Sequence, residues 1–191
     1  MKLLKYMLCI IFFILVSSKE IPALLKSQNI SYDENMQKLL STLRNESLRK
    51  NSPQEVIKAI KRLGELRSTE AVDDLIKLLT FRQSFNWEDH SGESINEIQP
   101  IHTGNRYPAT SALINIGKPA LPALVKIIQA QPSQSLASEN AIFTIKMIFR
   151  DNPLGGVEYL KQASISATST QAKQRLNNAV KMLEKVAIKQ N

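Results

Sequence analysis

A repeated helical pattern is the feature that most constrains the fold. The nine residues AVDDLIKLL (71–79) match ALPALVKII (120–128) position for position, aliphatic on aliphatic. Shortly before each of these, AIKRLG (59–64) matches ALINIG (112–117) in its alanine, its two aliphatic residues and its final glycine. The apolar residues recur at steps of three and four, which places them on one face of an α-helix. A pattern that occurs twice in this form predicts helical hairpins that stack on one another.

Each copy divides into two helices around a turn, most clearly in residues 109–129. One apolar stripe ends just before Gly117, where a glycine can adopt the left-handed conformation that closes a helix. Pro119 and Pro122 fall at the start of the next stripe. Backbone N–H groups lack intrahelical acceptors there, so a proline costs little. We therefore expect the prolines to start a helix, with an irregular first turn.

A third and weaker copy follows. AIFTIK (141–146) lacks the final glycine, and Asn152 is a good N-cap for a helix that begins at Pro153. Flanking apolar stripes predict one helix before the first copy and a long helix after the third, and both would cover open ends of the stack. Their apolar residues are Met36, Leu39, Leu40 and Leu43, and Ala172, Leu176, Ala179, Val180, Leu183 and Val186.

At ALINIGKPALPAL (112–124) the chain resembles the HEAT-repeat family, in its bacterial variety with the pattern A-L-x-x-I-G-x-P-A-[VL]-P-x-L. The resemblance extends over residues 52–165, closely in the second copy, moderately in the first and only by hydrophobic pattern in the third. It implies an all-α fold, a right-handed α-α superhelix (HEAT-like solenoid) of about three helix pairs plus N- and C-terminal capping helices. Since this fold serves many unrelated purposes, the resemblance assigns no activity.

The N-terminus is predicted to be a signal peptide. MKLLKYMLCIIFFILVSS (1–18) has two lysines, an apolar run and then small residues, which is the order of a cleaved secretory signal. The apolar run is shorter than the ~20 residues that span a bilayer. We expect a periplasmic or secreted protein that starts near Lys19 and has no stable membrane span after cleavage; a retained signal anchor is the alternative. Cys9, the only cysteine, would be removed with this peptide.

The mature chain then consists of an N-terminal segment at 19–31 and a HEAT-like helical repeat domain at 32–189. A long connection at 81–105 interrupts this domain between the two clear copies. Connections longer than about 12–15 residues are uncommon in compact domains. We therefore regard this loop as a candidate functional segment.

The loop 81–105 contains the only tryptophan, Trp87, and both histidines, His90 and His102. Two histidines at this separation match no zinc-site spacing. We therefore predict no bound metal or cofactor, and favour a loop whose aromatic side chains lie over the helices or anchor a partner. An enzyme or metal-binding protein centred on the two histidines is the alternative.

A row of lysines is the second candidate surface. The alignment of the copies places Lys77 on Lys126, with Lys161 near the third equivalent position. The family resemblance implies that the second helix of each pair lines a concave side, where such a row would suit an acidic ligand. Removal of residues 1–18 takes away two lysines and no acid, so the net charge of +8 falls to +6. This charge indicates acidic partners, polyanionic glycans or lipid head groups more than nucleic acid, although a charge of about this size is also ordinary for solubility.

We therefore expect an exported, non-enzymatic module that binds another protein, with an acidic partner favoured and nucleic acid not. Its candidate partner-binding residues are Lys77, Lys126, Lys161, Trp87 and His90. Binding to an acidic glycan or to a membrane surface by charge alone is a further alternative.

Overall fold

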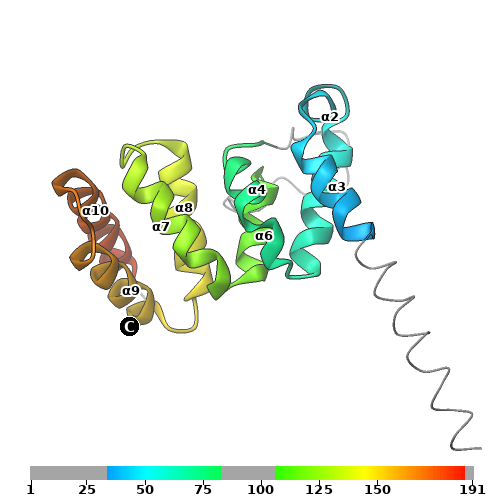
Figure 1. Ribbon diagram of the computed structural model, residues 1–191. Helices are drawn as coiled ribbons and strands as arrows, with labels where there is room; N and C mark the ends of the chain where they lie inside the picture. Colours follow the sequence, from blue (N-terminus) through cyan, green and yellow to red (C-terminus); the bar gives the residue numbers. More distant parts are fainter. Residues whose placement is uncertain (1–33, 83–105, 188–191) are drawn as a thin grey trace, which may run out of the picture. The chain divides into compact units, whose positions relative to one another are not determined.

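A computed structural model of the chain describes residues 34–82 and 106–187 (Figure 1). By its internal contacts the chain divides into two units, residues 1–38 and 39–191. In the first unit, the described residues 34–38 are helical. The predicted signal peptide and the segment at 19–31 lie outside the described residues.

The described part of the second unit is helical, with no strand in it, so the predicted all-α fold is confirmed. Residues 39–44 end a helix, and further α-helices and two short 3-10 helices (η) follow. These elements are α2 (Glu46–Asn51), α3 (Pro53–Glu65), η1 (Thr69–Ala71), α4 (Val72–Lys77), α6 (Pro108–Ile116), η3 (Lys118–Ala120), α7 (Leu121–Ala130), α8 (Leu136–Ile148), α9 (Pro153–Ile165) and α10 (Thr170–Ala187).

The two clear copies of the repeat fold in the same way. In each copy a first helix, α3 or α6, is followed by a 3-10 turn that leads directly into the second helix, α4 or α7. Leu75 and Leu124, which the alignment makes equivalent, are both fully buried. Pro119 lies in η3 and Pro122 in the first turn of α7. The prolines therefore start this helix as predicted, and η3 is the expected irregular turn.

The two aligned glycines have different structural roles. Gly117 follows α6 with a φ of 80° and a ψ of −140°. Its φ is positive, but this ψ lies outside the left-handed helical region predicted for it. Gly64 lies inside α3 and is buried. A Cβ atom at Gly64 would lie 2.7 Å from the Cα atom of Ala112 in α6. Glycine is needed at this position because α3 and α6 approach each other too closely for a side chain.

Helices that are distant in the sequence form the core. The helix α6 packs against α3 on one side and α8 on the other, while α4 packs against both α6 and α7. Asn140 of α8 is buried, and its Nδ2 donates a hydrogen bond of 2.7 Å to the backbone carbonyl of Leu79, just after α4. The large side chains that are almost completely buried are Leu43, Val56, Ile60, Leu63, Leu75, Leu79, Leu113, Leu124, Ile128, Ile145, Leu160 and Leu176.

The third pair differs from the prediction. Asn152 caps α9 as expected, since its side chain accepts a hydrogen bond of 3.1 Å from the backbone N–H of Gly155. However, α9 packs mainly against α10, and it is α10 that packs extensively against α7. Nη1 of Arg175 in α10 also donates a hydrogen bond of 2.7 Å to the carbonyl of Gln129 in α7. The helix that the sequence presented as a cap therefore takes the place beside α7.

Candidate interaction surface on the second helices

Lys77 and Lys126 lie at the same position of two neighbouring second helices. Lys77 ends α4 and Lys126 lies within α7, each five residues after the first residue of its helix. Both side chains are exposed, and α4 packs against α7. The alignment therefore pairs two exposed lysines on helices that pack against each other.

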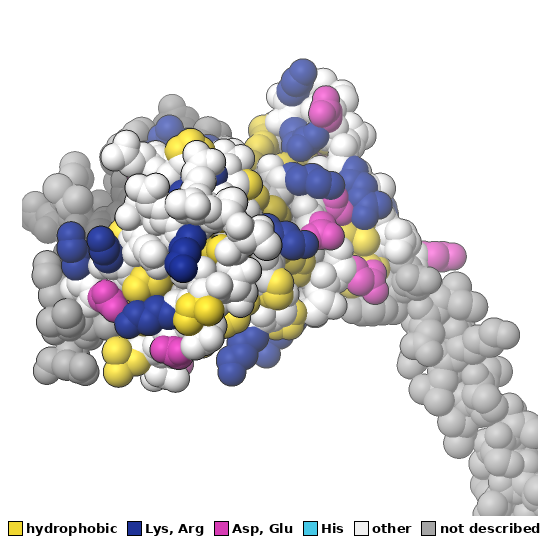
Figure 2. Space-filling model, turned by 60° about the vertical axis from the view of Figure 1, so that its left-hand side comes forward, with side chains coloured by type: hydrophobic (Ala, Val, Ile, Leu, Met, Phe, Trp, Pro, Cys, Tyr) yellow, Lys and Arg dark blue, Asp and Glu magenta, His cyan; other side chains and the backbone are white. Residues whose placement is uncertain are grey.

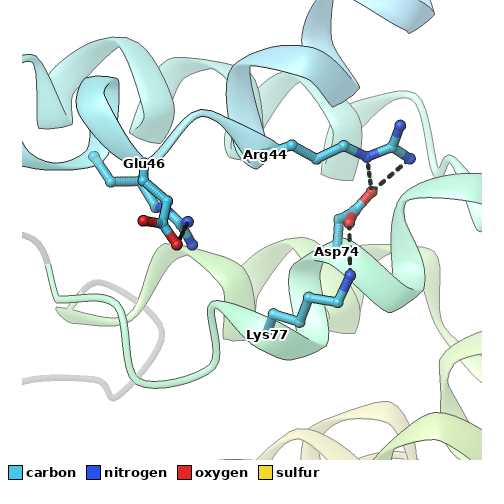
Figure 3. Close-up of polar contacts among 5 residues, drawn as sticks. Arg44, Glu46, Asp74 and Lys77 are labelled. Carbon is cyan, nitrogen blue, oxygen red and sulfur yellow. Dashed lines mark hydrogen bonds and ion pairs between the residues drawn. The ribbon is translucent and has the colours of Figure 1, made fainter.

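A buried carboxylate holds Lys77 together with an arginine from another helix (Figure 3). Asp74 is 7% exposed, and its Oδ1 accepts a hydrogen bond of 3.2 Å from Nζ of Lys77. Its Oδ2 lies 2.8 Å from both Nε and Nη2 of Arg44. The two cationic side chains stay largely exposed, at 59% for Arg44 and 71% for Lys77. Two solvent-exposed cations thus share one buried partner.

The electrostatics of this cluster keep Asp74 ionised. Burial alone would raise the pKa of Asp74, but the hydrogen bonds and positive charges of Arg44 and Lys77 outweigh it, so that its pKa lies below the ordinary value of 3.8. At neutral pH the three side chains together therefore carry one more positive than negative charge.

Arg44 was not among the predicted site residues. It is the last residue of the helix that precedes α2, and its position in the sequence resembles that of any exposed arginine. The sequence pointed to Arg44 only through its neighbour Leu43. The apolar stripe predicted that Leu43 lies in the core, and it is 2% exposed. This stripe shows that Arg44 lies at the edge of the packed face but does not identify the carboxylate beside it.

Lys126 differs from Lys77 in its surroundings. Where the first copy has Asp74, the second has Ala123. Within the described residues, no ion pair involves Lys126. We refer to Arg44, Lys77 and Lys126, with the exposed sides of α4 and α7 between them, as the α4–α7 face.

Lys161 does not continue this row, which corrects the prediction. It lies on α9, whose main neighbour is α10. Its Nζ lies 2.9 Å from Oε1 of Glu184 in α10, and this hydrogen bond and charge raise the pKa of Lys161. Lys161 therefore links the last two helices to each other. The prediction assumed that α9 would repeat the position of α7, and α10 packs there instead.

Trp87, His90 and His102 lie outside the described residues, so the predictions made for the loop 81–105 stay predictions. In the two described ranges no group of three or more His, Cys, Asp or Glu side chains is arranged to hold a metal ion. No single described helix is long and apolar enough to cross a membrane. Pro108–Ile116 and Lys118–Ala130 meet these criteria only as a pair, and this pair is bent by 114°.

Lysine and arginine side chains are spread over the face drawn in Figure 2, with fewer acidic side chains among them. This distribution agrees with the positive net charge of +8 for the whole chain. On this face the basic side chains belong to the described part of the chain.

Comparison with known proteins supports the predicted family. Residues 57–81 match the family model of the PBS lyase HEAT-like repeat. No curated protein and no solved structure matches the chain. The matched segment runs from α3 through α4, so it is the first copy of the repeat, whereas the pattern quoted above fits the second copy more closely. The comparison thus shows that residues 57–81 are similar to a HEAT-like repeat, as the sequence pattern predicted for this family.

Proposed function

We propose that this protein is an exported, non-enzymatic module that binds another protein through its α4–α7 face. HEAT-like repeats stack into surfaces that serve as binding scaffolds, and this supports the general role. The observation that carries the proposal is the pair Lys77 and Lys126, which two neighbouring second helices expose at equivalent positions. A surface that the repeat itself duplicates is suited to a ligand that extends across several helices.

Site-specific crosslinking tests this role. A photoreactive amino acid at position 126 should give a covalent adduct of defined mass with one partner protein in the producing cells. The matched control carries the same group at position 58, an exposed lysine of α3. No adduct from position 126, or equal adducts from both positions, would contradict the proposal.

Export is supported by the order of charged, apolar and small residues at the N-terminus. Sequencing of the mature N-terminus in the exported fraction tests it. A start at or near Lys19 is expected, and recovery of the full-length chain from the cytoplasm alone would contradict it.

The non-enzymatic part of the proposal rests on the spacing of the two histidines, which matches no zinc site. Calorimetry with zinc, manganese and calcium on metal-stripped protein tests this part. We expect no stoichiometric binding. Binding that His90→Ala and His102→Ala each abolish would favour the enzyme or metal-binding alternative.

A further inference from the structure

We infer that the α4–α7 face binds an extended acidic segment of the partner protein, in which carboxylates recur every third residue. This inference rests on the proposed function and assigns a chemical class to the partner. Its basis is the charge, the unused hydrogen-bond donors and the spacing of three side chains: Arg44, Lys77 and Lys126.

The cations of this face keep donors available for a ligand. Asp74 engages Nε and Nη2 of Arg44, and Figure 3 shows the remaining nitrogen directed away from the carboxylate. The ammonium group of Lys77 has three donors, and Asp74 accepts from it through Oδ1. Lys126 forms no ion pair within the described ranges. A carboxylate can therefore approach each cation without displacing Asp74.

Neighbouring acids weaken the positive charge of this face only in part. Asp74 is buried and already satisfied by two cations. Glu46, at the start of α2, lies 3.4 Å from Arg49 and is paired there (Figure 3). Asp73 is exposed on α4, so the first copy carries one solvent-facing acid beside Lys77. The second copy has none in the equivalent stretch, ALPALVKII.

The repeat sets the spacing between the cations of the two copies. The axes of packed helices lie about 8–10 Å apart, and α4 packs against α7, so a ligand that bridges Lys77 and Lys126 has to span a separation of about this order. A polyproline II segment has three residues per turn and rises ~3.1 Å per residue. Side chains at i and i+3 of such a segment therefore lie on one side, ~9 Å apart. Acids at this spacing would reach both lysines at once.

The ion pairs with Asp74 also favour binding. They hold Arg44 and Lys77 in defined positions before a partner arrives, so that less side-chain freedom is lost on association. An isolated surface lysine such as Lys126 lacks this advantage. A partner gains it by contacting Arg44 and Lys77 as well as Lys126.

A peptide titration with the mature protein tests the inference. One labelled peptide has glutamate at every third position among prolines, and a second has the same composition with its glutamates contiguous. We expect the first peptide to bind more tightly, and Lys126→Gln to weaken its binding by about 1.5- to 5-fold, the range expected for the loss of one exposed ion pair. Lys126→Arg should retain binding, added salt should weaken it, and the control Lys58→Gln should leave it unchanged.

Equal affinity for the two peptides, or equal affinity of Lys126→Gln and wild type, would overturn the inference. The inference would also be overturned if heparin or anionic lipid vesicles bound more tightly than the first peptide and lost affinity in Lys126→Gln. The ligand would then be a glycan or a membrane. If crosslinking at position 126 captures a partner while both peptides fail to bind, the acidic segment is wrong and the proposed function stands. If crosslinking fails as well, the proposed function fails.

Discussion

The first and second copies of the repeat are alike in their core and different on their surface. Leu75 and Leu124 are both fully buried, and each second helix begins with a 3-10 turn. On the surface, the first copy has a buried aspartate held between two cations. The second copy has an alanine in its place, and its lysine has no ion pair with any described residue. The repeat thus specifies which positions are buried and leaves each copy free to carry its own charges.

The family match sharpens this comparison. It covers residues 57–81, the copy without prolines in its second helix. The proline-rich second copy has the same buried positions and the same order of helices. Prolines at a helix start are therefore one way to begin the second helix, and residues such as Thr69 and Glu70 in η1 are another.

The largest expected effect tests whether the two cores are equivalent. Leu75→Ala and Leu124→Ala should each destabilise the fold by about 2–5 kcal/mol, through lost burial and a residual cavity. Urea unfolding of both variants measures this. If either variant unfolds no more easily than wild type, the two positions are not equivalent in the core, because that leucine would then not be packed between helix pairs.

A buried hydrogen bond between α8 and the end of the first copy gives the next effect. Asn140→Ala removes the donor to the carbonyl of Leu79. A buried carbonyl left without a partner costs about 1–3 kcal/mol, so the free energy of unfolding should fall by that amount. Glu139→Ala, at the exposed neighbouring position of the same helix, is the control. An equal loss in both variants would show that this bond adds nothing specific.

The two glycines should respond differently to side-chain size. At Gly64, alanine should cost about 1–3 kcal/mol of overpacking against Ala112, offset by up to about 1 kcal/mol of helix propensity, and leucine should cost more. At Gly117, alanine should cost about 1–3 kcal/mol, because a φ of 80° with a ψ of −140° is a conformation that glycine adopts readily and other residues do not. Leucine should cost about the same there, since a Cβ atom at Gly117 would have no neighbouring atom within 4 Å and the side chain begins in open space. Thermal unfolding of the four variants measures this. If leucine cost clearly more than alanine at position 117, glycine would be needed there for lack of space and not for its backbone conformation.

The smallest effect concerns the charges. The pKa of Asp74 is lower in the folded state than its ordinary 3.8. Its ion pairs therefore add stability above that value, which is lost as the pH falls through the folded-state pKa. Lys77→Gln should cost about 0.2–1 kcal/mol at neutral pH, less in acid, while Lys126→Gln should cost almost nothing at either pH. Urea unfolding at pH 7 and pH 3 measures both, and a pH-independent loss at Lys77 would argue against the pairing.

Part of the candidate site could be predicted from the sequence. The alignment predicted that Lys77 and Lys126 occupy equivalent positions on neighbouring helices, because equivalent residues of successive repeats lie on the same side. Lys161 was placed wrongly, because the third copy is weak and its helix order was assumed from the first two. Arg44 was missed because its partner Asp74 lies 30 positions further along the chain, and no local pattern records a contact of that kind.

The sequence by itself determined the helices of the repeat copies and their buried faces, whereas α2 (Glu46–Asn51) was not predicted. Helix periodicity, N-caps and prolines act within a few residues, and the hydrophobic stripe of each helix must be covered by another helix. Only the tertiary structure decided which helices cover which stripes. Both α9 and α10 have apolar faces that fit a neighbour, and it is α10 that packs against α7. Only the tertiary structure also explains Gly64. Glycine is needed there because the backbone of α6 lies too close for a side chain, and not because of the turn that follows α3. Such choices depend on shape and distance between segments far apart in the chain, and these become definite only when the helices are packed.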